Sequence, residues 1–174
     1  MPKRSPGMLL DALSGPQPLT LPQLQEVLLN ASPATTFRYL RQVPYVRSYN
    51  ENGRYYTLFD PQRFDSFGLL SLGTVRFSQD RSLTATLPRL VNQAEAGWTD
   101  KELQHLLHVP VHGPLLDAVR RDRIQREPIH GVFVYLSADA QQAHSPPIRL
   151  EHITAVLAEF DLEPLGEKGG PAHS

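Results

Sequence analysis

The apolar positions near the start of the chain recur at helical spacing and predict two short helices. The first covers residues 8–13 and ends before Gly15 and Pro16, because glycine supplies a turn and proline cannot continue a helix. The second follows Thr20, which we predict to be its N-cap. One face of this second helix is predicted to be core and carries Leu21, Leu24, Val27 and Leu28.

A third helix is predicted to begin at Ser32 and Pro33, an N-cap followed by a proline in the first turn. Its inward face should carry Phe37, Leu40 and Val43. Its outward face is rich in hydroxyls and arginines and consists of Ser32, Thr35, Thr36, Arg38, Tyr39 and Arg41. Such a face suits a helix that reads DNA, since hydroxyls bind phosphates and arginine reads guanine edges. An ordinary solvated face would have much the same composition, so the helix alone leaves both interpretations open.

A β-hairpin is predicted next, because aromatic and β-branched residues at 45–49 and 54–58 flank Asn52 and Gly53. Residues 32–58 contain four arginines and a single acid, Glu51, so this stretch is locally basic. Phosphate contacts of the hairpin are predicted at Arg47, Asn52 and Arg54.

The order helix, helix, hairpin recurs after a connector at 61–81. The connector is expected to pack between the two halves and to contain a short strand around Val75 and Phe77. Helices are predicted after Ser82, after Thr99 and from Pro114, and strands at 124–126 and 132–136. At one constant offset the core positions superpose. The superposed pairs are Leu24 and Leu103, Val27 and Leu106, Leu28 and Leu107, Phe37 and Leu116, Leu40 and Val119, Arg47 and Arg126, and Tyr56 and Tyr135.

The second copy differs from the first at the start of its last helix, which reads PLLDAV in place of SPATTF. Residues 99–137 balance five basic residues against five acidic ones. The basic candidates for phosphate contact are Arg120, Arg121 and Arg126. Asp117 and Asp122 could equally pair with these arginines at helical spacing. We therefore favour packing or dimer contacts over base reading for this copy.

The remaining residues, 138–174, predict a polar linker, an amphipathic helix and a disordered tail. The helix would either pack on its own domain or join two chains in a homodimer, and the sequence does not separate these. The predicted domains are thus a first module at 1–60, the connector at 61–81, a second module at 82–137 and this C-terminal part. The predicted fold class is α+β, mainly α.

Composition narrows the possible functions. The formal net charge is -1, which gives no global attraction to nucleic acid, and the absence of cysteine excludes disulfides and thiolate metal sites. No export signal or membrane span is predicted, which favours a cytoplasmic protein. The sequence has no phosphate-binding glycine loop, no Gly-x-Ser-x-Gly motif and no His-Glu-x-x-His motif, so we expect neither an enzyme nor a cofactor. His105 and His108 are three residues apart, but no carboxylate is placed to complete a metal site.

The stretch SPATTFRYL, followed by YTL at the end of a glycine-tipped hairpin, resembles the winged helix-turn-helix superfamily. TLPRLVNQAEAGWTDKELQHLL and VFVYLS are similar to parts of tandem winged-helix proteins associated with bacterial mobile elements. The resemblance implies two winged helices that bind double-stranded DNA, as a regulator or accessory factor. The alternative is a protein-interaction scaffold, as in tandem winged helices of the chromosome-condensation type.

Overall fold

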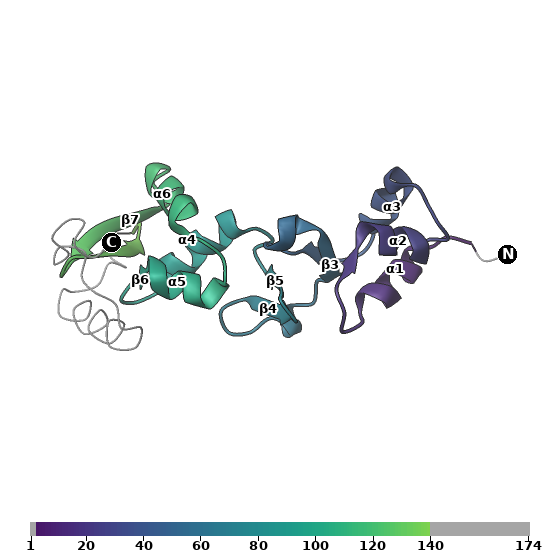
Figure 1. The fold of residues 1–174 in the computed structure, drawn as a ribbon, viewed down its shortest axis with the longest axis horizontal. Coiled ribbons are helices and arrows are strands. Elements are labelled where there is room, and N and C mark those ends of the chain that lie inside the picture. Colours follow the sequence, from purple (N-terminus) through teal and green to yellow (C-terminus); the bar gives the residue numbers. More distant parts are fainter. Residues whose placement is uncertain (1–2, 140–174) are drawn as a thin grey trace, which may run out of the picture. The chain divides into compact units, whose positions relative to one another are not determined.

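The computed structural model describes residues 3–139 of the 174-residue chain (Figure 1). The chain divides into two compact units, Met1–Thr86 and Leu87–Ser174. The described residues form a mixed α+β fold with six α-helices and three small antiparallel sheets. None of these helices has both the length and the apolar character that crossing a membrane requires. The helix and tail predicted after residue 139 lie outside the described residues.

The first unit begins with three helices, and side-chain hydrogen bonds cap the starts of the second and the third. The Thr20 amide donates to Gln23 Oε1 at 2.8 Å, and the Ser32 side chain accepts from the Thr35 amide at 3.2 Å, so both predicted N-caps lie where the helices begin. The elements in order are α1 (Pro6–Leu13), β1 (Leu19–Thr20), α2 (Leu21–Val27), α3 (Pro33–Leu40), β2 (Tyr45–Arg47) and β3 (Tyr55–Leu58). Their common core includes Leu9, Leu13, Leu24, Leu28, Leu40 and Tyr56.

The connector forms a second hairpin, β4 (Leu69–Leu72) and β5 (Val75–Ser78), and belongs to the first unit. The expected strand around Val75 and Phe77 is β5, and its partner β4 was not predicted. Val46, Val75 and Phe77 form a small apolar cluster that packs this hairpin against β2. A short 3-10 turn, Pro61–Arg63, precedes the hairpin.

The second unit has the same kinds of element in the same order. They are α4 (Leu83–Gln93), β6 (Trp98–Thr99), α5 (Asp100–Leu107), α6 (His112–Arg120), β7 (Ile124–Ile129) and β8 (Val132–Ser137), and the unit boundary falls inside α4. Leu103, Leu107 and Leu115 are fully buried in this unit. The last helix begins two residues earlier than predicted, and β7 is longer than the predicted strand because it continues to a tight turn at 130–131.

The two three-stranded sheets share both strand order and register. The orders are β1-β3-β2 and β6-β8-β7. Leu19 pairs with Tyr56 in the first sheet, and the residues 79 positions later, Trp98 and Tyr135, pair in the second. The pair Arg47 and Tyr56 is repeated at the same offset by Arg126 and Tyr135. The offset found in the sequence is therefore a repeat of backbone pairing as well as of apolar pattern.

Candidate nucleic-acid interface

Helix α3 presents its start and its arginines to solvent. Ser32, Arg38 and Arg41 are exposed, while Thr35 and Tyr39 are half-buried. The Ser32 hydroxyl bonds to Thr35 Oγ1 at 3.1 Å, and the Arg38 guanidinium lies 5.6 Å from the centroid of the Tyr39 ring. Most of the predicted outward face is therefore available to a ligand.

The side chains of two residues of α3 face the opposite way from the prediction. Thr36, predicted to face outward, is fully buried, and Phe37, predicted to face the core, is 36% exposed. Thr36 can be buried because its Oγ1 donates to the Ser32 carbonyl at 2.9 Å, which satisfies the hydroxyl within the helix. Thr36 lies one turn before Leu40, so the buried stripe passes through Thr36 and Leu40 rather than through Phe37.

The tip of the β2–β3 hairpin is held by its own arginines. Arg47 Nε donates to the Gly53 carbonyl at 2.9 Å, and its guanidinium lies 5.4 Å from the Tyr56 ring centroid. Arg54 forms an exposed ion pair with Glu51 at 3.4 Å, and Asn52 has a left-handed φ of 56°. All three predicted wing residues, Arg47, Asn52 and Arg54, are exposed.

An open groove of about 500 Å³ lies between α3 and this hairpin tip. Its cationic side consists of Arg47 and Arg54, and its apolar side includes Phe37 of α3. The remaining lining residues are Thr20, Leu21, Pro22, Asn52 and Tyr56. Three predicted site residues therefore meet at one groove, together with Phe37 and the start of α2, which the sequence reasoning did not include. The signal that could have found Phe37 is the alternative helical stripe through Thr36 and Leu40.

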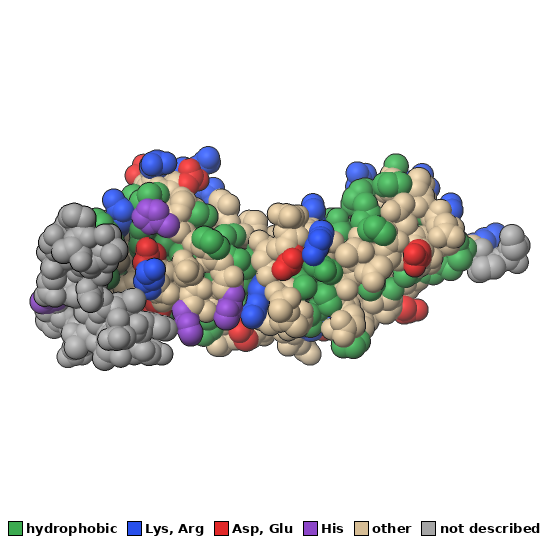
Figure 2. Space-filling view, in the orientation of Figure 1, with side chains coloured by type: hydrophobic (Ala, Val, Ile, Leu, Met, Phe, Trp, Pro, Cys, Tyr) green, Lys and Arg blue, Asp and Glu red, His purple; other side chains and the backbone are tan. Residues whose placement is uncertain are grey.

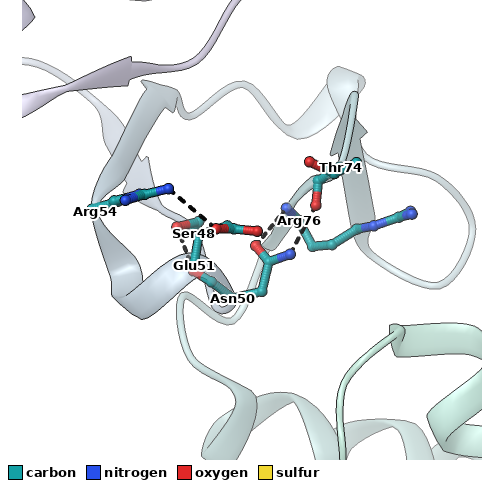
Figure 3. A network of polar contacts seen from close by, with 6 residues as sticks. All are labelled: Ser48, Asn50, Glu51, Arg54, Thr74 and Arg76. Atoms are coloured by element: carbon teal, nitrogen blue, oxygen red, sulfur yellow. Dashed lines mark hydrogen bonds and ion pairs between the residues drawn. The ribbon is translucent and has the colours of Figure 1, made fainter.

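Asn50 fastens the hairpin tip to the connector (Figure 3). Its Nδ2 donates to the Thr74 carbonyl at 2.8 Å, and its Oδ1 accepts from the Arg76 amide at 2.9 Å. The Tyr49 amide donates to the Arg76 carbonyl at 2.9 Å, which continues the same contact along the backbone. Hairpin β4–β5 therefore braces the segment that carries Glu51 and Arg54.

Tyr49 gives this brace a predicted pH dependence. Burial raises the pKa of the Tyr49 hydroxyl to about 12, with Arg76 opposing the shift and Asp65 adding to it. A raised folded-state pKa means that the stability contributed by neutral Tyr49 is complete below pH 10 and is lost as the pH rises toward 12. Because Tyr49 is only partly buried, solvent screening reduces the effect, and we expect the free energy of unfolding to fall by about 1–2 kcal/mol over this interval. Urea titrations at several pH values would measure it, and Tyr49→Phe should remove this part of the decline.

The second unit arranges its basic residues differently. Val111 occupies the N-cap position of α6 and offers no side-chain acceptor. Arg121 forms an ion pair with Asp117 at 3.0 Å, one of the two acidic partners that the sequence offered. The Arg126 guanidinium lies 4.2 Å from the ring centroid of Phe133. Arg120 is exposed. In the view of Figure 2, blue and green side chains cover α3, whereas blue side chains mix with red ones over α6.

The ring centroids of His105 and His108 are 6.3 Å apart. Within residues 3–139, no group of three or more histidine, aspartate or glutamate side chains could hold a metal ion. Comparisons of the chain with family models, curated proteins and solved structures found no match.

Proposed function

We propose that the first unit binds double-stranded DNA, as a winged helix-turn-helix with α3 in the major groove and the β2–β3 hairpin as its wing. The observation that carries the proposal is the groove between α3 and the hairpin tip, with Arg47 and Arg54 on one side and Phe37 on the other. Phe37 of α3 and the basic hairpin line the same groove, so the helix and the hairpin could contact base edges and backbone together.

Each exposed side chain has a distinct role in this proposal. Ser32 and Thr35, at the start of α3, would bond to phosphate or base edges, and Arg38 and Arg41 would read guanine or pair with phosphate. Arg47, Asn52 and Arg54 would contact the backbone beside the wing. Thr36 is left out because it is buried. The unit would act as a sequence-specific regulator or accessory factor.

The second unit supports a different role, contact with protein. Its repeated register gives it the same framework, yet α6 begins with Val111, and Asp117 neutralises Arg121 at 3.0 Å. Val111 is buried, so the start of α6 exposes neither a hydroxyl nor an arginine, and Arg121 is already paired with an acid. This surface offers less to phosphate than α3 does and suits a protein partner or a second chain better. We propose this unit as the scaffold part of the protein, with Arg120 and Arg126 at most adding phosphate contacts.

Fluorescence titration of a labelled duplex at increasing salt would test the proposal. Arg54→Ala should lower the slope of log affinity against log salt by about one, because one phosphate contact is lost. Arg38→Ala should relax sequence preference on a duplex selected from a random pool by about 1–3 kcal/mol. Glu51→Gln removes the acid that pairs with Arg54 and should tighten binding, a gain that damage to the fold would not produce.

Lys101→Ala is the matched control, because it removes an exposed cation from α5 in the second unit. Its affinity and salt slope should equal those of the unchanged protein. Absence of duplex binding at low salt would contradict the proposal and leave the scaffold function for both units. An unchanged salt slope in Arg54→Ala would contradict the placement of the wing.

A further inference from the structure

Phe37 is an exposed aromatic residue that shares a groove with two arginines. It lies at the middle of α3, is 36% exposed, and lines the groove that Arg47 and Arg54 also line. Arg38 is its neighbour in sequence, and Arg41 is one helical turn further along the same side of α3. An exposed phenyl ring in the middle of α3 thus lies near arginines of the helix, of its C-cap and of the hairpin.

This combination restricts the ligand to one that is both anionic and locally apolar. Arginine side chains pair with phosphates, while a phenyl ring gains by contact with another apolar group. The major groove of DNA offers both, because its phosphates flank base edges, of which thymine alone carries a methyl group, at C5. Arg38 and Arg41 would hold the phosphates or guanines next to that base.

We infer that Phe37 is a specificity-determining residue that contacts the 5-methyl group of thymine. The inference rests on the proposed DNA-binding function and deepens it by naming a base that the site selects. Burying one methyl group corresponds to about a fourfold gain in affinity. Each methyl group that Phe37 contacts should therefore favour thymine over uracil by about that factor.

The test replaces thymines by deoxyuridine, which removes only the methyl group. Duplexes selected from a random pool by the unchanged protein serve as probes, and each thymine is replaced singly. We expect about a fourfold loss at one or two positions and none elsewhere. Phe37→Ala and Phe37→Gln should bind the thymine and uracil duplexes equally, and the glutamine variant keeps the side-chain length if alanine perturbs the helix.

Phe67→Ala is the matched control, since Phe67 is 39% exposed but lies in the connector. It should keep the full preference for thymine. If the unchanged protein shows no thymine preference at any position, or if both Phe37 variants keep it, the inference is wrong while duplex binding stands. If the unchanged protein binds no duplex at low salt, the proposed function fails, and the inference fails with it.

Discussion

Replacing Gly97 with alanine should destabilise the second unit by about 3 kcal/mol or more. Gly97 has φ +76°, and an added Cβ would lie 2.6 Å from the Tyr135 carbonyl oxygen and 2.6 Å from Leu136 Cδ2. A left-handed φ costs about 1–2 kcal/mol for a residue with a Cβ, and overpacking adds about 1–3 kcal/mol. The carbonyl belongs to the central strand β8 and cannot move without disturbing both of its neighbours.

Trp98 gives a direct measurement of this loss. It is the only tryptophan in the chain, it follows Gly97, and its indole donates to the Leu90 carbonyl at 3.1 Å. Tryptophan fluorescence in urea therefore reports the second unit. Gly73→Ala is the control for backbone strain alone, since Gly73 has φ +64° and no atom within 4 Å of an added Cβ. Because Gly73 belongs to the first unit, the loss in this variant is measured by circular dichroism in urea instead of by Trp98 fluorescence. A loss in Gly97→Ala no larger than that in Gly73→Ala would show that the predicted clash is absent.

Replacing Asn50 with aspartate should loosen the contact between the connector hairpin and the wing, at a cost of about 1–2 kcal/mol. The two side chains have the same shape, so acceptance from the Arg76 amide at 2.9 Å can remain. The Asn50 Nδ2 group, which donates to the Thr74 carbonyl at 2.8 Å, is replaced by a carboxylate oxygen. This charged oxygen would then face the Thr74 carbonyl oxygen and repel it. Losing a hydrogen bond in this way costs about 1–3 kcal/mol for a buried group. The contact with Thr74 is exposed, so the lower part of this range applies.

Amide hydrogen exchange would locate the effect. The amides of Tyr49 and Arg76 both donate across the contact between wing and connector, so both should exchange faster in Asn50→Asp by about tenfold. Asn52→Asp is the matched control, because it makes the same charge change two residues away at an exposed left-handed position that aspartate tolerates. Equal exchange of these amides in both variants would contradict the role given to Asn50.

The sequence predicted those features that depend on nearby residues. The caps at Thr20, Ser32 and Thr99 need only a partner three residues on, and each is found at the start of its helix. Hairpin β2–β3 follows from aromatic and β-branched residues around a turn that positive-φ residues can form. The constant offset of the repeat could be read from apolar positions, and the backbone register extends it.

The features that were missed depend on competing local patterns or on distant residues. Thr36 and Phe37 are both at helical spacing from Leu40, and the core takes Thr36, whose hydroxyl is satisfied by the Ser32 carbonyl. Asn50 bonds to residues 24 and 26 positions away, which no periodicity predicts. Strand β4 could have been found from Gly73, whose positive φ forms the turn to β5.

Because the two sheets share one register, the segment in the middle of each unit can be exchanged for its counterpart in the other unit. From the N-cap of the last helix to the first residue of the next strand, one copy runs over 32–45 and the other over 111–124, so the two stretches are equal in length. Transplanting one into the other would leave every strand pair in phase. The surface of this helix can therefore diverge between the copies, or be redesigned, without changing the strand pairing of the sheet that supports it.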